Sequence, residues 1–263
     1  MKFLVVFSMC VLAVSGAALE VELDFLSGPV SAEEERLINS ILTADFDTAF
    51  AQTLQLQRQS KENIIEDAVT KLVRGSKRNV LDYAYKLWFG EAKEIVKNHF
   101  PVQFRQILSE SVVKIISKRD NLAIKLGQDL DAEKDRTAYG DANDKTSENV
   151  SWKFVPLWDN NRVYFKIVSV FRHQSLKVGT DADSQGDHGT YGDDVADTHR
   201  HQWFLKPANL EGDVLFYIFN RKFNQALKLG RAVDSDGDRI VYSHYGNVDG
   251  QPELYGWHIS EFN

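Results

Sequence analysis

The sequence has almost no cysteine. Its single cysteine, Cys10, lies in the apolar segment at the start of the 263-residue chain. A disulfide joins two cysteine residues, so the sequence excludes a bridge within the chain. Without disulfides the fold has to be held by a hydrophobic core, and a chain of this length can build one or two such cores.

Long hydrophobic runs are also missing. The most apolar stretch, Phe3 to Val14, has about twelve residues, fewer than the ~20 that cross a bilayer as a helix. Lys2 precedes this stretch and the small residues from Ser15 to Ala17 follow it, which is the order of a secretory signal peptide. We therefore predict that residues 1–17 are a signal peptide and that the protein is secreted and not membrane-spanning. A retained membrane anchor is the alternative.

The sequence has fewer basic than acidic residues. The chain has 31 Lys and Arg residues against 38 Asp and Glu residues, which gives a formal net charge of −7. Binding of nucleic acid depends on a basic surface, so this balance argues against a nucleic-acid partner. It suits a protein that stays soluble at high concentration.

Motifs for catalysis and metal binding are absent or incomplete. We find no nucleophile elbow, phosphate loop or zinc-protease helix. Asp234 to Asp238 is similar to the start of a calcium loop, but the sixth place holds Arg239 where that loop needs Gly. His199 and His201 would share one face of a strand without a third ligand nearby. We expect no catalytic residue, metal or cofactor; an enzyme with an unfamiliar site is the alternative.

A helical pattern of apolar residues extends from about residue 31 to 108. Apolar residues from Ile64 to Val73 recur at helical spacing, and Ser31 followed by Glu34 is typical of a capping box. Helix ends are expected at Gly75, Gly90 and Pro101, because glycine and proline interrupt helices. The pattern predicts a small helical domain of about five helices within residues 18–108.

The remaining chain repeats itself three times. Lys125, Lys177 and Lys228 lie in similar strand-like segments and are 52 and 51 residues apart. A tyrosine and a tryptophan recur in each unit: Tyr139, Tyr191 and Tyr242, then Trp152, Trp203 and Trp257. Three units of about fifty residues, each with about four short strands, predict a β-trefoil over residues 109–263. The tryptophans are expected at equivalent buried positions.

A hydrophobic ligand is expected in the helical half. The barrel of a trefoil is filled by its own side chains, whereas helices can separate without losing their internal hydrogen bonds. Most large apolar side chains of this half must form its core, and some of them are candidates for lining a cleft. The candidate lipid-pocket residues are Ile65, Val69, Leu72, Tyr83, Leu87 and Trp88.

Two short motifs concern carbohydrate. The segment Gln202 to Phe204 is similar to the Gln-x-aromatic signature of ricin-like lectins, with Phe204 in place of Trp and no glutamine at the matching places of the other repeats. Asn149 begins an Asn-Val-Ser sequon, which predicts a glycosylation site in an exported chain. An ordinary loop asparagine is the alternative.

Longer segments carry a resemblance over the whole chain. The sequence resembles the thirty-kilodalton lipoprotein family of moth haemolymph, which is related to microvitellogenins. The segments that carry the resemblance are Tyr85–Trp88, Asn98–Arg105, Asn121–Gly127, Val150–Phe154, Asn160–Ile167, Gln202–Phe204 and Asp213–Phe216.

This resemblance implies both a fold and a function. The implied fold is a multidomain α+β protein with an N-terminal all-helical domain of the VHS type and a C-terminal β-trefoil. The implied function is that of a haemolymph storage protein, a nutrient reservoir that carries lipid or another hydrophobic small molecule and is taken up by eggs and tissues, with an uptake receptor as partner. The alternative is a lectin-like protein that binds glycans through the trefoil.

Overall fold

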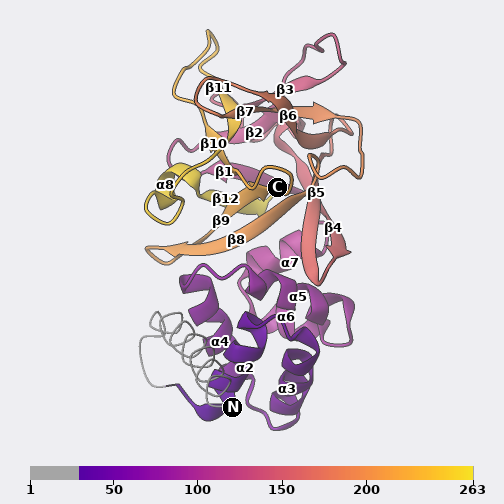
Figure 1. Cartoon of the computed structure of the whole chain (residues 1–263), viewed down its shortest axis with the longest axis vertical. Helices are drawn as coiled ribbons and strands as arrows, with labels where there is room; N and C mark the ends of the chain where they lie inside the picture. The colour runs from indigo at the N-terminus through magenta and orange to yellow at the C-terminus, as the bar shows by residue number, and fades with distance from the viewer. Residues whose placement is uncertain (1–29, 263) are drawn as a thin grey trace, which may run out of the picture.

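Helices and strands lie in two parts of the molecule, with the helices first in the chain (Figure 1). The structure is a computed structural model and describes residues 30–262. The predicted signal peptide lies outside the described residues. Within them, no helix is both long and apolar enough to cross a bilayer.

Within residues 30–262, six helices precede the strands, where the sequence predicted about five. Their ends agree with the sequence signals: α4 ends before Gly75, α5 ends before Gly90, and Pro101 separates α6 from α7. The helices are α2 (Ala32–Leu42), α3 (Phe46–Arg58), α4 (Glu62–Arg74), α5 (Asn79–Phe89), α6 (Lys93–His99) and α7 (Val102–Leu108).

Helix α2 begins with half of the predicted capping box. The Ser31 hydroxyl accepts the backbone N–H of Glu34 at 3.2 Å, which satisfies one of the free donors at a helix start. The Glu34 carboxylate pairs instead with Lys71 of α4, at 2.7 Å. The contact joins α2 to α4 and keeps both charged groups paired where they are mostly buried.

Twelve strands follow in the part of the chain that the structure describes. The first begins at Val113, close to the predicted change from helix to strand at residues 108–109. A short 3-10 helix η1 (Glu148–Val150) and a short helix α8 (Pro252–Tyr255) interrupt the strands. The strands are β1 (Val113–Ser117), β2 (Ala123–Leu126), β3 (Arg136–Asp141), β4 (Trp152–Asp159), β5 (Arg162–Ser169), β6 (Ser175–Ala182), β7 (His188–Asp193), β8 (Trp203–Leu210), β9 (Asp213–Asn220), β10 (Ala226–Leu229), β11 (Arg239–His244) and β12 (Trp257–Glu261).

The predicted β-trefoil is corrected by the strand pairing. All twelve strands join one antiparallel sheet in the order β10-β11-β3-β2-β1-β12-β9-β8-β5-β6-β7, with β4 paired to β1 and β5. The prediction required a barrel of three hairpins with a separate cap of three more. Instead, long strands such as β5 pair with several neighbours, β4, β6 and β8, and so connect the hairpins into a continuous sheet. The order of helices first and strands second is as predicted.

The threefold repeat is visible in the tryptophans. All three are buried, and the indole N–H of each donates to a backbone carbonyl of the β2, β6 or β10 strand of its own repeat. Their equivalent buried positions are as predicted. The three bonds are Trp152 to Ile124 at 2.7 Å, Trp203 to Leu176 at 2.8 Å and Trp257 to Leu227 at 3.1 Å.

Helices and sheet share one hydrophobic core. Phe104 of α7 packs edge-on against Phe216 of β9, with ring centroids 5.6 Å apart. Nearby, Asp82 of α5 accepts the backbone N–H of Val163 at 2.7 Å and a guanidinium N–H of Arg162 at 2.8 Å. Burial raises the pKa of Asp82 above its ordinary value, although these donors favour its charged form. The division of the chain into domains at residues 18–108 and 109–263 stays a prediction.

Candidate functional site

A lysine flanked by carboxylates recurs in the sheet. In the first repeat, Lys125 of β2 pairs with Asp141 at 3.1 Å and with Asp238 at 2.6 Å. In the second, Lys177 of β6 pairs with Asp193 at 2.8 Å and with Asp135 at 2.5 Å. One partner ends the neighbouring strand of the same hairpin, and the other comes from the hairpin turn of another repeat. Each ammonium group is therefore held between two carboxylates.

The third repeat departs from this pattern. Lys228 of β10 pairs with Asp187 at 2.9 Å. At the strand position that Asp141 and Asp193 occupy in the other repeats, β11 carries His244, which lies opposite Ala226 of β10. The His244 imidazole also contacts Asp187. One carboxylate thus serves two side chains here.

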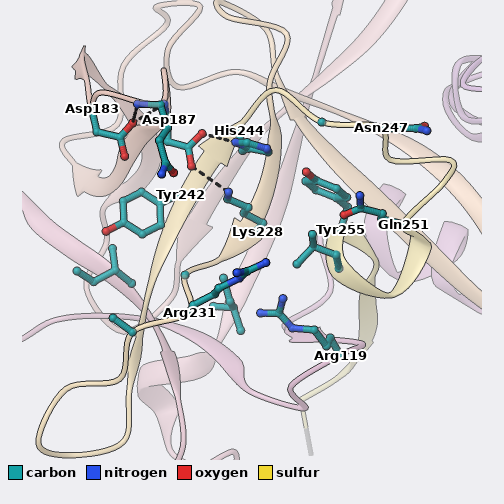
Figure 2. Close-up of a pocket in the computed structure, with 17 residues that line it drawn as sticks. Arg119, Asp183, Asp187, Lys228, Arg231, Tyr242, His244, Asn247, Gln251 and Tyr255 are labelled. Atoms are coloured by element: carbon teal, nitrogen blue, oxygen red, sulfur yellow. Dashed lines mark hydrogen bonds and ion pairs between the residues drawn. The ribbon is translucent and has the colours of Figure 1, made fainter.

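A hollow of about 610 Å³ lies beside Lys228 and His244 (Figure 2). Its walls are β10 and β11, the turn between β6 and β7, the turn between β1 and β2, and the segment that contains α8. That segment runs from 245 to 256 and is longer than the corresponding segments 142–151 and 194–202. The additional length forms α8 and places Tyr255 parallel to His244, with ring centroids 6.1 Å apart.

The charged groups of the hollow differ in how they are paired. Arg119 pairs with Asp120 at 2.7 Å. Arg231 is exposed and has no ion pair or hydrogen bond with any residue of the described chain. Backbone N–H groups of Asp187 and Gln185 bond the Asp183 carboxylate and lower its pKa, so it stays ionised.

The helical lipid-pocket candidates lie in the core. Each is buried, Trp88 being the most exposed at 7%. Ile65, Val69 and Leu72 are on α4, and Tyr83, Leu87 and Trp88 are on α5. The structure brings the six into the core shared by the helices and the sheet, and none of them lines the hollow beside His244.

A second hollow, of about 310 Å³, opens on the surface of the helical half. We call it the aromatic hollow; its lining is Asp47, Phe50, Tyr85, Lys86, Phe89 and Gly90. Tyr85 packs against Phe89 at 4.5 Å between ring centroids and stacks on Trp158 of β4 at 4.9 Å. Phe89 is 54% exposed. The hollow therefore presents a partly open aromatic surface beside one ammonium group, that of Lys86.

The lectin-like segment is not at an open site. Trp203 is buried, and the Gln202 side-chain oxygen accepts an N–H of Arg221 at 2.7 Å. The Phe204 ring lies under the guanidinium of Arg78, 4.0 Å from its centroid. These side chains are used within the fold, where Arg78 joins the helices to the sheet.

The remaining motif residues have local partners. The Asp234 carboxylate accepts the N–H groups of Asp236 and Asp238 at 2.9 Å and so closes a turn. His201 is buried and its ring contacts Thr198 at 2.7 Å. Within residues 30–262 no group of three His, Cys, Asp or Glu side chains is placed to hold a metal ion.

The sequon residue lies in η1. The Asn149 amide group donates to the hydroxyl of Ser147 at 2.9 Å, and the side chain is half-buried. Glycosylation of Asn149 stays a prediction.

Sequence reasoning missed both hollows. The signal for the first was present, because Tyr139 and Tyr191 are each followed two places later by Asp, whereas Tyr242 is followed by His244. Because the three repeats can be compared with one another, such a departure can be recognised from this sequence alone. The aromatic hollow had no comparable signal, since its rings follow the same helical spacing as the core.

Comparison with known proteins identifies the family. The chain belongs to the lepidopteran low molecular weight (30 kD) lipoproteins, whose family profile matches residues 31–261. It is 54% identical to microvitellogenin of Manduca sexta, over 86% of this chain and 91% of that protein. It is 46% identical to low molecular mass lipoprotein PBMHPC-23 and 44% identical to PBMHP-12, both of Bombyx mori, over the full length of each chain. The family is one of lipoproteins and is not defined by an enzymatic activity.

Proposed function

We propose that the protein is a secreted, non-enzymatic storage protein of haemolymph that carries lipid or another hydrophobic small molecule and enters eggs and tissues through an uptake receptor. The observation that carries the proposal is the family profile over residues 31–261, together with relatives named as lipoproteins and as a microvitellogenin. Native mass spectrometry of the protein purified from its source tests carriage directly. A bound lipid mass is expected, and a ligand-free protein from every tissue would contradict it.

We propose the aromatic hollow as the surface that a lipid first contacts. The six core candidates are buried in one hydrophobic cluster, so a ligand among them requires the helices to separate. The aromatic hollow needs no such movement, because Phe89 is already exposed beside Tyr85. An acyl chain on these rings would remove apolar surface from water, and Lys86 could pair with a fatty-acid carboxylate in place of Asp47, which it contacts at 3.2 Å.

Substitution of Phe89 tests this placement. The variant Phe89→Asp is expected to weaken binding of a fluorescent fatty acid roughly tenfold or more, because the acyl chain loses an aromatic contact and meets a negative charge. Phe171→Asp is the matched control, since Phe171 is 42% exposed in the sheet half and its substitution should leave binding unchanged. If Phe89→Asp binds normally while Val69→Ala alters binding, the ligand lies among the core candidates instead.

Glycan binding is the second candidate function. The observation that favours it is the hollow of the third repeat, which combines the parallel rings of Tyr255 and His244 with polar side chains such as Gln251. A glycan array with the full chain tests it. Specific binding that is lost on Tyr255→Ala supports this function, and binding to no glycan contradicts it.

A further inference from the structure

In the hollow of the third repeat, Lys228 has fewer carboxylate partners than the equivalent lysines of the other repeats. The equivalent lysines of the other repeats each have two carboxylate partners, whereas Lys228 has only Asp187. An ammonium group has three N–H donors, so Lys228 keeps donors that no carboxylate takes. The replacement of an aspartate by His244 at the end of β11 produces this difference.

A second cation is specific to the same repeat. Arg231 lies three places after Lys228, where the other repeats carry Gln128 and Thr180. It is exposed, and no described residue pairs with it. In Figure 2 the guanidinium groups of Arg231 and Arg119 point toward one another below Lys228. A guanidinium group has five N–H donors in a planar arrangement that matches the oxygens of carboxylates and phosphates.

The acidic residues of the hollow leave Arg231 without a carboxylate partner. Asp187 is already shared between Lys228 and His244. Asp183 is ionised and its charge acts on Lys228 without an ion pair, while its carboxylate accepts backbone N–H groups and lies in Figure 2 on the side of the hollow opposite Arg119. The space between Lys228 and Arg231 therefore faces cations on both sides.

We propose that this hollow binds a small organic anion, whose carboxylate, sulfate or phosphate group lies between Lys228 and Arg231. The remainder of the ligand is polar, because Gln251 and Asn247 line the adjoining wall together with the Tyr255 ring. The hollow, of about 610 Å³, has room for a ligand the size of an acidic monosaccharide. The inference is independent of lipid carriage, since the two hollows share no residue.

Calorimetric titration of the full chain tests the proposal. The probes are glucose 6-phosphate, galactose 6-sulfate and glucuronate, with glucose and inorganic phosphate alongside. We expect at least one acidic sugar to bind and glucose to bind at least tenfold more weakly. Arg231→Gln, which installs the residue of the first repeat, should weaken binding about tenfold or more through loss of a charged hydrogen-bond donor. Arg74→Gln on the exposed surface of α4 is the charge-matched control and should bind as the unchanged protein does.

A second variant places a carboxylate of the protein itself in the proposed anion site. His244→Asp restores the second carboxylate beside Lys228, as in the other repeats, and should abolish binding while circular dichroism shows a folded protein. Binding of inorganic phosphate alone would support the site and assign the affinity to the acid group. Silence from all three acidic sugars and phosphate, equal binding of glucose, or unchanged binding by Arg231→Gln would each overturn the proposal.

Discussion

Replacing Trp203 by alanine is expected to lower the free energy of unfolding by about 3–5 kcal/mol. The side chain is fully buried, and its indole N–H donates to the Leu176 carbonyl at 2.8 Å. Alanine leaves a cavity and an unpaired buried carbonyl, and both effects destabilise the native state. Urea unfolding of the full chain measures the loss. Because the three tryptophans are equivalent, Trp152→Ala and Trp257→Ala should have effects of similar size.

Two further variants separate the contributions. Trp203→Phe keeps most of the volume but removes the N–H donor, so we expect a smaller loss of about 1–3 kcal/mol. Phe171→Ala changes an exposed ring and should alter the free energy of unfolding by less than about 0.5 kcal/mol. A loss below about 1 kcal/mol for Trp203→Ala would contradict the role of this side chain in the core.

Replacing Asp82 by alanine is expected to cost about 3 kcal/mol of unfolding free energy. The substitution leaves the buried N–H of Val163 without an acceptor and removes the carboxylate partner of Arg162, which keeps its bond to Asn79. Urea unfolding again gives the measurement. Asp47→Ala is the control, because the Asp47 carboxylate is 92% exposed in its pair with Lys86 and its loss should cost about 0.5 kcal/mol at most. Equal effects of the two substitutions would contradict the importance of burial.

The contribution of Asp82 to the free energy of unfolding is expected to change with pH in one direction. Burial raises the pKa of Asp82. Above about pH 4, the unfolded chain therefore loses the carboxyl proton of Asp82 at a lower pH than the native state does. The Asp82 contribution to stability is therefore fully present below the unfolded pKa and decreases as the pH rises through the raised native pKa. Asp82→Asn keeps an acceptor for Val163 and has no such proton, so its stability should lack this decrease. The difference between unchanged protein and Asp82→Asn, measured by urea unfolding at several pH values, checks the sign.

The parts of the fold that depend on local chemistry could be predicted from the sequence. Helix α4 follows from the spacing of apolar residues between Ile64 and Val73, and its end follows from Gly75. The equivalence of the tryptophans follows from the register of the repeat. The connection of the hairpins into one sheet could not be predicted in this way, because a repeat specifies equivalent positions but not which edges pair.

Contacts between distant parts of the chain were also beyond sequence reasoning. Asp82 and Val163 are separated by 81 residues, and nothing near either position indicates the other. The helical lipid-pocket candidates illustrate a related limit. Apolar spacing selects side chains that face inward, and a core and a pocket wall satisfy that criterion equally. Only the packed structure distinguishes the buried Leu87 from the exposed Phe89.

The core shared by helices and sheet has a consequence for breakdown of the protein. Residues as far apart in the chain as Leu37 and Ile259 belong to one continuous cluster, so opening either part exposes apolar surface of the other. Proteases that cleave opened chains act at a rate set by the population of the open form. We expect each molecule either to resist digestion or to be degraded completely, with little accumulation of stable fragments. For a nutrient reserve, global stability would then determine when amino acids are released.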